Sequence, residues 1–338
     1  MDTTTSEAGS ECLALETYPG WSLRAFETDI APVLNNVARR SMHVRWIETC
    51  WPGASTANRY RLFPGSLFLL WLEAFGSEIS PAHARIAAAI ELLHNASLLH
   101  DDILDRHDSR RGERTIRATH GDSFALLTGD AAVGIAFSLL SEIQPQLCAD
   151  AATALGAAWL RMTEGQMMDE PDTWARIGEA EWLSHWACMS RSKLALGNVA
   201  GPLAAQVCGM SRVVGQVRDL HDDFSIVSQI INDLGDLERL SGFHVVTTCR
   251  RVEASETSIK PTLARIWGRL SSVDGARDAG SRHANWRAAS KWVMAETETA
   301  LARLDVMALD ASAARILKDF FSRPACEVQR IMRGLVDA

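Results

Sequence analysis

Apolar positions recur with a helical period along almost the whole chain, and the strict alternation of apolar and polar residues that is typical of strands is nearly absent. Alanine, leucine and methionine are plentiful, and these residues favour helices. The pattern predicts helices at 22–50, 62–76, 81–106, 121–142, 147–169, 178–208, 212–239, 259–270, 284–309 and 311–336, with a loop at 268–282. The expected fold is all-α.

The composition indicates one large domain. With 338 residues, of which 47% are hydrophobic, the chain is long enough to bury a sizeable core, and no shift in composition divides it. The first twenty residues are polar and resemble a flexible leader more than a signal peptide. We therefore expect a leader at 1–20 and a single helical domain at 21–338.

Charge, hydropathy and cysteine use restrict the partners and the compartment. The net charge is -8 and there is no basic run, which argues against a nucleic-acid partner. Apolar runs are far shorter than the roughly 20 residues that span a bilayer, so we expect no transmembrane segment. The seven cysteines are an odd number without a CxxC pair, which indicates reduced thiols and a cytoplasmic location.

An acidic cluster at the end of a long helix is the clearest candidate for chemistry. Ser80 and Pro81 are expected to begin this helix, and Asp101, Asp102 and Asp105 lie near its C-terminal end. An isolated pair of aspartates is usually a solvated face. This helix, however, is otherwise apolar over most of its circumference, and carboxylates buried there need a metal or a basic partner. Hard oxygen ligands at one place suit Mg²⁺, which also binds substrate phosphates.

Further polar residues belong to the same cluster. His94 and Ser97 share an arc of about 80° with the first and third aspartates of the cluster. Arg110 and Arg111 follow within a few residues and supply charge-assisted donors for the phosphates that the metal would bind.

A second acidic helix is expected to complete the site. Gln229, Asn232, Asp233 and Asp236 fall within about 100° of arc at the end of the mostly apolar stretch 224–231. A helical bundle can direct two such polar ends into one cavity, where they share metal ions.

The motifs resemble those of a known family. ELLHNASLLHDDILDRHDSRRGE, residues 91–113, resembles the first aspartate-rich motif of the trans-isoprenyl diphosphate synthases. Further matches follow in order, namely TGDA at 128–131, GQMMD at 165–169, RS at 191–192, QIINDLGD at 229–236 and KPTL at 260–263. The resemblance covers residues 55–265 or so.

The resemblance implies a fold, a cofactor and a set of binding residues. The fold would be a single-domain helical bundle of the isoprenoid synthase type with a deep central cavity, usually dimeric, in which about three Mg²⁺ ions bind an allylic prenyl diphosphate. Arg110, Arg191 and Lys260 match diphosphate-binding positions, and Gln229 matches a position beside the second motif. Lys193 is an alternative to Arg191.

Other positions depart from the family in the region that binds the co-substrate isopentenyl diphosphate. Chain-elongating members carry GGKxxRP there, and this chain has ANRYRLFPG. If Glu73 sets the register, Arg61 replaces the lysine and Pro64 stands at the arginine position, while His94 and Arg111 are retained. A shifted register that uses Arg59 and Arg61 would restore part of the site. The chain therefore keeps only part of the family's co-substrate site, for which the candidate residues are Arg61, His94 and Arg111.

Two more features bear on the reaction. Asn232 replaces the first aspartate of the second motif, which should weaken one metal position and leans towards a terpene cyclase, although the cyclase triad is incomplete at Asp236 and Leu240. Ala96 and Ser97 are small where short-chain members place an aromatic floor, so a C15 or C20 chain should fit.

Three functions remain open from the sequence. The first is a class I terpene synthase on the prenyl-synthase scaffold, which ionises a C15 or C20 diphosphate and lets the cation cyclise or lose a proton. The second is a chain-elongating prenyl diphosphate synthase, or a prenyltransferase that acts on another nucleophile. The third is a non-catalytic subunit of a heteromeric synthase. The altered co-substrate region favours the first, the terpene synthase, which is therefore the main prediction. The retained histidine and arginine favour the second, and the intact DDILD motif argues against the third.

Overall fold

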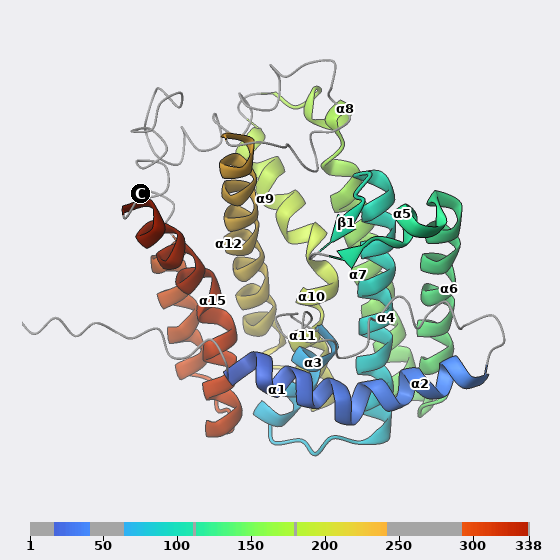
Figure 1. The fold of residues 1–338 in the computed structure, drawn as a ribbon. Helices are drawn as coiled ribbons and strands as arrows, with labels where there is room; N and C mark the ends of the chain where they lie inside the picture. The colour runs from blue at the N-terminus through green and yellow to red at the C-terminus, as the bar shows by residue number, and fades with distance from the viewer. Residues whose placement is uncertain (1–16, 41–63, 111–112, 179–180, 242–292, 337–338) are drawn as a thin grey trace, which may run out of the picture.

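The computed structural model describes residues 17–40, 64–110, 113–178, 181–241 and 293–336, and they form one all-helical domain (Figure 1). Besides a helix at 293–305, the elements are α1 Thr17–Ala25, the π-helical turn η1 Phe26–Ile30, α2 Ala31–Arg40, α3 Pro64–Ala74, α4 Pro81–Leu104, β1 Ser109–Arg110, β2 Glu113–Arg114, α5 Ile116–His120, α6 Asp122–Leu140, α7 Pro145–Met168, α8 Pro171–Trp174, α9 Trp182–Lys193, α10 Ala195–Asn198, α11 Ala200–Val207, α12 Val214–Ser241 and α15 Ala311–Val336. The predicted all-α, single-domain fold is confirmed.

The long helices lie where the hydrophobic pattern predicts them. Helices α3, α4, α6, α7, α12 and α15 agree with the predicted ranges to within about two residues at each end. The start of α4 is fixed by a reciprocal cap, in which the Ser80 hydroxyl accepts from the backbone N–H of His83 and the His83 ring accepts from the backbone N–H of Ser80. Pro81 occupies the first helical turn, where its missing N–H costs nothing.

The helix predicted at 178–208 is in fact three helices, so this prediction was wrong in its continuity. Leu194, with φ -93° and ψ 11°, separates α9 from α10, and Val199 separates α10 from α11. Pro202 has no backbone N–H to bond to the carbonyl of Asn198, so it interrupts the hydrogen-bond ladder at that point. The break lets the Asn198 side chain turn to α12, where its amide donates to Asp222 Oδ1 at 3.2 Å.

Some predictions lie partly or wholly outside the described residues. These are the last part of the helix at 22–50, the helix at 259–270, the loop at 268–282 and the first part of the helix at 284–309. Within the described part, the first predicted helix is divided into α1, η1 and α2. Because α1 begins at Thr17, the last four residues of the expected leader are helical.

The core is organised around α3, whose side chains from Leu67 to Leu72 are all buried. A helix that is apolar on every side lies inside a bundle. Helix α3 packs against α1, α4, α11 and α15, and the amide of Gly65 is held by the carboxylate of Glu91 on α4 at 2.8 Å. This interior helix supports the long helices that carry the acidic motifs.

One polar pair is buried within this core. Trp71 Nε1 on α3 donates to His221 Nε2 on α12 at 2.9 Å, and neither side chain has appreciable exposure. Burial lowers the pKa of the His221 imidazole to about 3, so the ring stays neutral and can accept this hydrogen bond.

This pair predicts a pH dependence of stability. Between pH 6.5 and pH 3 the unfolded chain protonates His221 and the folded chain does not, so unfolding binds a proton. The free energy of unfolding should therefore fall by about 1.4 kcal/mol for each pH unit below 6.5 through this residue. Urea unfolding of the wild type and of His221→Gln, measured from pH 7 to pH 4, tests this prediction, because glutamine keeps an acceptor but does not titrate. Equal pH slopes in both proteins would contradict the assignment.

The cysteines agree only in part with the expected reduced state. Cys148, Cys188 and Cys208 are free thiols, whereas Cys326 is in a disulfide, so the expectation of seven reduced thiols is wrong for Cys326. The cytoplasmic location stays a prediction.

One described helix, α6, is long and apolar enough to cross a membrane by length and composition alone, and 39% of its most apolar stretch is buried in the protein. This helix packs along α4 (Figure 1).

The arrangement of α4 and α12 positions the site. Both helices run from the lower to the upper side of the molecule in Figure 1, and α7, α9 and α10 lie between them. The C-terminal ends of α4 and α12, which carry the two acidic motifs, therefore point to the same side of the bundle.

Candidate active site

The first acidic motif lies at the C-terminal end of α4, where the helix ends in a tight turn. Asp105 is the C-cap residue, and Arg106 has a left-handed backbone with φ 54°. This conformation is rare outside glycine, and here it turns the chain back towards the helix. The backbone N–H of His107 then bonds to the carbonyl of Asp102 at 2.9 Å. The turn keeps the acidic end of α4 and the residues after it together.

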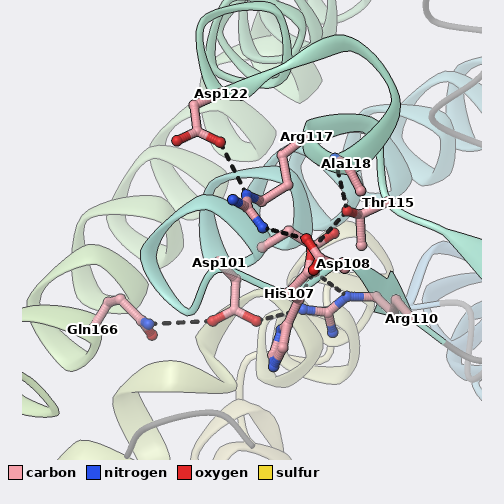
Figure 2. A network of polar contacts seen from close by, with 10 residues as sticks. Asp101, His107, Asp108, Arg110, Thr115, Arg117, Ala118, Asp122 and Gln166 are labelled. Carbon is pink, nitrogen blue, oxygen red and sulfur yellow. Dashed lines mark hydrogen bonds and ion pairs between the residues drawn. The ribbon is translucent and has the colours of Figure 1, made fainter. Parts of the chain in front are cut away.

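A short hairpin brings Arg110 over the aspartates. β1 pairs with β2, and from β1 the guanidinium of Arg110 donates through Nη2 to Asp101 Oδ2 at 2.6 Å and through Nε to Asp102 Oδ1 at 2.8 Å. Figure 2 shows Asp101 between Arg110 on one side and Gln166 on the other. Burial works to lower the pKa of Arg110, but Asp101 and Asp102 outweigh it and raise that pKa. The structure thus brings Arg110 to Asp101 and Asp102, while its predicted role in binding a diphosphate stays a prediction.

The surroundings of Asp105 disfavour the charged form of its carboxyl. Burial first, and then the charge of Asp101, raise the pKa of the Asp105 carboxyl to about 8, while Lys193 opposes the rise and Asp169 adds to it. Lys193 Nζ is 2.5 Å from Asp169 Oδ2. Burial would lower the pKa of Lys193, but the surrounding carboxylates, Asp169 foremost, raise it above its usual range. A carboxyl in these surroundings is one that a metal cation would stabilise.

Helices α7 and α9 cross closely beside the aspartates. At Gly165 a Cβ atom would lie 2.6 Å from the backbone nitrogen of Lys193 and 2.7 Å from Cβ of Ser192. One residue further on, Gln166 Nε2 donates to Asp101 Oδ1 at 3.2 Å. The absence of a side chain at Gly165 thus lets α9 deliver Lys193 to the acidic cluster.

We expect Gly165→Ala to disturb both stability and the site. The added methyl group must push α9 away from α7, which should lower the free energy of unfolding by about 1–3 kcal/mol. Gly156→Ala on the same helix is the matched control, because a methyl group there would meet no neighbouring group within 4 Å and alanine favours helix. Urea unfolding of both variants checks this. Equal effects of the two substitutions would show that the crossing is not tight.

Other predicted residues are only partly placed. Arg61, Arg111 and Lys260 lie outside the described residues, and so do the side chains of Asn232, Asp233 and Asp236, although their backbone belongs to α12. Their roles stay predictions. Gln229 is half-buried on the same helix.

Of the two basic residues on α9, Lys193 is the one that reaches the carboxylates. Arg191 is half-buried, and its backbone carbonyl accepts from the Asn198 side chain at 3.4 Å. Lys193 was predicted only as the alternative to Arg191. Asp169 and Gln166 were not among the residues predicted for the site, although the GQMMD motif contains both.

The predicted cavity floor and co-substrate histidine lie on α4 below the aspartates. Ala96 has no exposed surface, whereas Ser97 is half-buried and its hydroxyl donates to the carbonyl of His94 at 2.7 Å. Of the two predicted floor residues, only Ser97 therefore has surface with which to line a cavity. His94 is also half-buried.

The cluster has the donors of a metal site. One ligand atom from each of Asp101, Asp105 and His107 lies within 4.8 Å of the others. The two carboxylates supply the oxygen ligands that Mg²⁺ requires, so the residues fit the predicted cation. His107 is a member that the sequence prediction missed. Its signal was a histidine two residues beyond the third aspartate of the motif.

Cationic side chains surround a buried acidic helix end in this bundle. Enzymes that bind anionic groups through metal ions have such an arrangement. The family model of the polyprenyl synthetases matches residues 59–241, which is more than half of the chain. The protein belongs to this family.

Two curated relatives illustrate the similarity. The geranylgeranyl diphosphate synthase of Methanosarcina mazei is 30% identical over 174 residues, which cover 48% of this chain and 53% of that protein. The (2E,6E)-farnesyl diphosphate synthase of Mycobacterium tuberculosis is 27% identical over 281 residues, covering 76% of this chain and 71% of that protein. The chain thus spans about half the length of the first of these relatives.

Solved structures show the same fold. A decaprenyl diphosphate synthase from Rhodobacter capsulatus superposes with a TM-score of 0.66 at 21% identity, covering 92% of this chain and 99% of that one. A polyprenyl synthase from Caulobacter crescentus, solved with calcium and isoprenyl diphosphate, has a TM-score of 0.66 at 18% identity and covers 91% of this chain and 97% of that one. The predicted isoprenoid synthase type of fold is confirmed.

Proposed function

We propose that this protein is a chain-elongating trans-prenyl diphosphate synthase, which transfers an allylic prenyl group to isopentenyl diphosphate. The observation that carries the proposal is the acidic end of α4. Four carboxylates, those of Asp101, Asp102, Asp105 and Asp169, gather there, and among the described residues Arg110 and Lys193 form ion pairs with them. The excess of negative charge suits divalent ions, and the ions and cationic side chains together suit a diphosphate.

The chain's own residues have separate tasks in this reaction. Mg²⁺ ions, when bound, would supply positive charge to the diphosphate as its C–O bond breaks and the electron pair leaves with the oxygen. Asp101 and Asp105 would hold the ions, and Arg110 and Lys193 would turn from carboxylates to phosphate oxygens. The number of ions, the roles of Arg111 and Lys260, and the C15 or C20 length of the allylic chain belong to the same proposal.

The similar proteins support elongation over cyclisation. The relatives named above are prenyl diphosphate synthases, and this favours the second of the three functions left open by the sequence. A terpene synthase is the second candidate, because Asn232 stands in the second motif and Arg61 and Pro64 stand in the altered co-substrate region.

Product analysis separates these functions. The protein is incubated with Mg²⁺ and farnesyl or geranylgeranyl diphosphate, with and without isopentenyl diphosphate, and both the organic extract and the diphosphates are analysed. The proposal predicts longer diphosphates formed only with isopentenyl diphosphate. Hydrocarbon or alcohol released without it would establish the cyclase instead. No turnover with any donor would leave the subunit function.

We also propose that the protein is a homodimer through α6 and α7. Among the described residues, four of the five most exposed large apolar side chains lie on these adjoining helices, namely Leu126, Leu127, Leu160 and Met167. Contiguous exposed apolar surface marks an interaction site, and these four side chains would contribute to one. A second copy suits it better than a bilayer, because the exposed carboxylate of Asp130 lies on α6 and a lipid-facing charge is costly.

Light scattering after size exclusion tests the dimer. The wild type should have twice the chain mass of 37.1 kDa. Leu127→Glu should give the monomer mass, because a two-fold interface would bury two new charges. Val306→Glu is the control, since Val306 is 83% exposed outside these helices and its variant should stay dimeric. A wild-type monomer would end this proposal.

A further inference from the structure

His107 lies within the acidic cluster and has an unused nitrogen. Its side chain is 13% exposed, and Nδ1 is 3.5 Å from Asp102 Oδ1. Nε2 is buried and has no hydrogen-bond partner among the described residues. One ring nitrogen is within 4.8 Å of a carboxylate oxygen of both Asp101 and Asp105. A buried donor or acceptor without a partner is costly, so a ligand that used this nitrogen would remove that cost.

The backbone holds His107 in place from both sides. Its N–H donates to the carbonyl of Asp102 at 2.9 Å, which the left-handed turn at Arg106 makes possible. Its carbonyl accepts from the hydroxyl of Thr115 at 2.7 Å. Thr115 is itself buried and fixed, because its hydroxyl also caps α5 by accepting from the backbone N–H of Ala118 (Figure 2). The imidazole is therefore positioned before any ligand arrives, as a metal ligand needs to be.

We propose that His107 gives a ring nitrogen to one of the divalent ions held by Asp101 and Asp105, so that this site binds Mn²⁺ or Co²⁺ more tightly than Mg²⁺. The inference rests on the proposed function, which requires divalent ions at these two aspartates. Imidazole nitrogen is a good ligand for transition metals, whereas Mg²⁺ prefers oxygen. Protein sites generally bind Co²⁺ more tightly than Mn²⁺, and the nitrogen ligand would strengthen this preference.

Asp102 has a distinct part in this arrangement. Metal-bound histidines commonly donate their second ring N–H to a carboxylate, which orients the ring. With Nε2 on the metal, Nδ1 would face Asp102 Oδ1, the atom that also accepts from Arg110. Asp102 is buried, unlike the half-buried Asp101 and Asp105. It would thus orient His107 and would not itself bind the ion.

Electron spin echo spectroscopy of bound Mn²⁺ tests this directly, with Mn²⁺ and inorganic pyrophosphate as probes. The wild type should show the ¹⁴N coupling of a directly bound imidazole. His107→Gln and His107→Asn place an amide near Nε2 and near Nδ1 respectively, and both should lose the coupling. His120→Gln changes an exposed histidine on α5 and should keep it. In equilibrium titrations the His107 variants should bind Mn²⁺ about tenfold more weakly or worse, with a smaller change for Mg²⁺.

The outcomes separate the inference from the proposed function. Two outcomes would overturn the role of His107 and leave the synthase proposal standing. In the first, Mn²⁺ binds in an Asp101-dependent manner but shows no ¹⁴N coupling. In the second, the coupling persists in both His107 variants. No bound Mn²⁺ in the presence of pyrophosphate would overturn both. Coupling in the wild type that is lost in either folded His107 variant supports the inference.

Discussion

Asp105→Asn is expected to reduce diphosphate release at least a hundredfold and, at the same time, to make the metal-free protein more stable at pH 8. The loss of activity follows because one of the carboxylates proposed to hold the metal ions is removed, and ions of this kind stabilise the developing charge on the leaving group. The gain in stability follows from the pKa of about 8, which burial and the neighbouring carboxylates impose on this group.

The direction of the stability change depends on pH. The pKa of Asp105 in the folded protein is above its ordinary value of 3.8, so the folded state holds the proton more tightly than the unfolded chain does. The stability that Asp105 contributes is therefore lost as pH rises from about 4 to about 8. A neutral asparagine avoids this loss, and the gain should be about 1 kcal/mol or more at pH 8 and should vanish near pH 4.

Two measurements and one control check this prediction. Release of inorganic diphosphate from an allylic substrate gives the activity, and thermal unfolding in chelator at pH 4 and pH 8 gives the stability. Asp108→Asn is the matched control, because Asp108 is 72% exposed and its carboxylate pairs with Arg117 at the surface. It should change neither quantity appreciably. Substantial retained activity in Asp105→Asn would remove this residue from the mechanism.

Trp71→Ala is expected to destabilise the protein by about 3–5 kcal/mol. Trp71 is completely buried in α3, stacks on Phe75 with ring centroids 5.4 Å apart, and meets Phe321 edge-on at 6.3 Å. Truncation leaves a cavity among these rings and also leaves His221 without its donor. Domains are commonly stable by about 5–15 kcal/mol, so this single change should bring the protein close to unfolding at 37 °C.

A second variant at Trp71 separates the loss of the ring from the loss of its N–H, and an exposed position serves as the control. Trp71→Phe keeps much of the ring and loses the N–H, so it should cost about 1–3 kcal/mol. Val306→Ala is the control, because it removes an exposed apolar side chain outside α6 and α7, and it should stay within about 0.5 kcal/mol of the wild type. Urea unfolding at a fixed low protein concentration measures all three. A cost below 1 kcal/mol for Trp71→Ala would contradict the central place of α3 in the core.

The long helices could be predicted because their signals are local. Ser80 and Pro81 mark the start of α4 in the sequence, and the apolar pattern carries through to its acidic end. The break of the predicted 178–208 helix was missed because the apolar pattern continues across Leu194 and Pro202 while the backbone does not. The hairpin of β1 and β2 is only two residues long on each strand and has no periodicity to detect.

In the candidate site, too, some contacts could be predicted from the sequence and others could not. Asp101, Asp102 and Arg110 are close in sequence, and their union followed from the motif. The approach of Lys193 depends on the crossing of two helices at Gly165, and the position of His107 depends on one left-handed residue. Such tertiary details are not encoded in spacing. The preference for a cyclase rested on altered positions. Of these, Arg61 lies outside the described residues, and only the backbone of Asn232 is described.

The acidic ends of α4 and α12 are proposed to bind one and the same diphosphate. A crystal structure of the protein with Mn²⁺ and inorganic pyrophosphate, with the metal located by its anomalous scattering, tests this most directly. We expect Mn²⁺ ions on Asp101 and Asp105 and another beside Asp236, all touching the same pyrophosphate. Pyrophosphate bound elsewhere, or Asp101 and Asp236 facing away from each other into solvent, would contradict it.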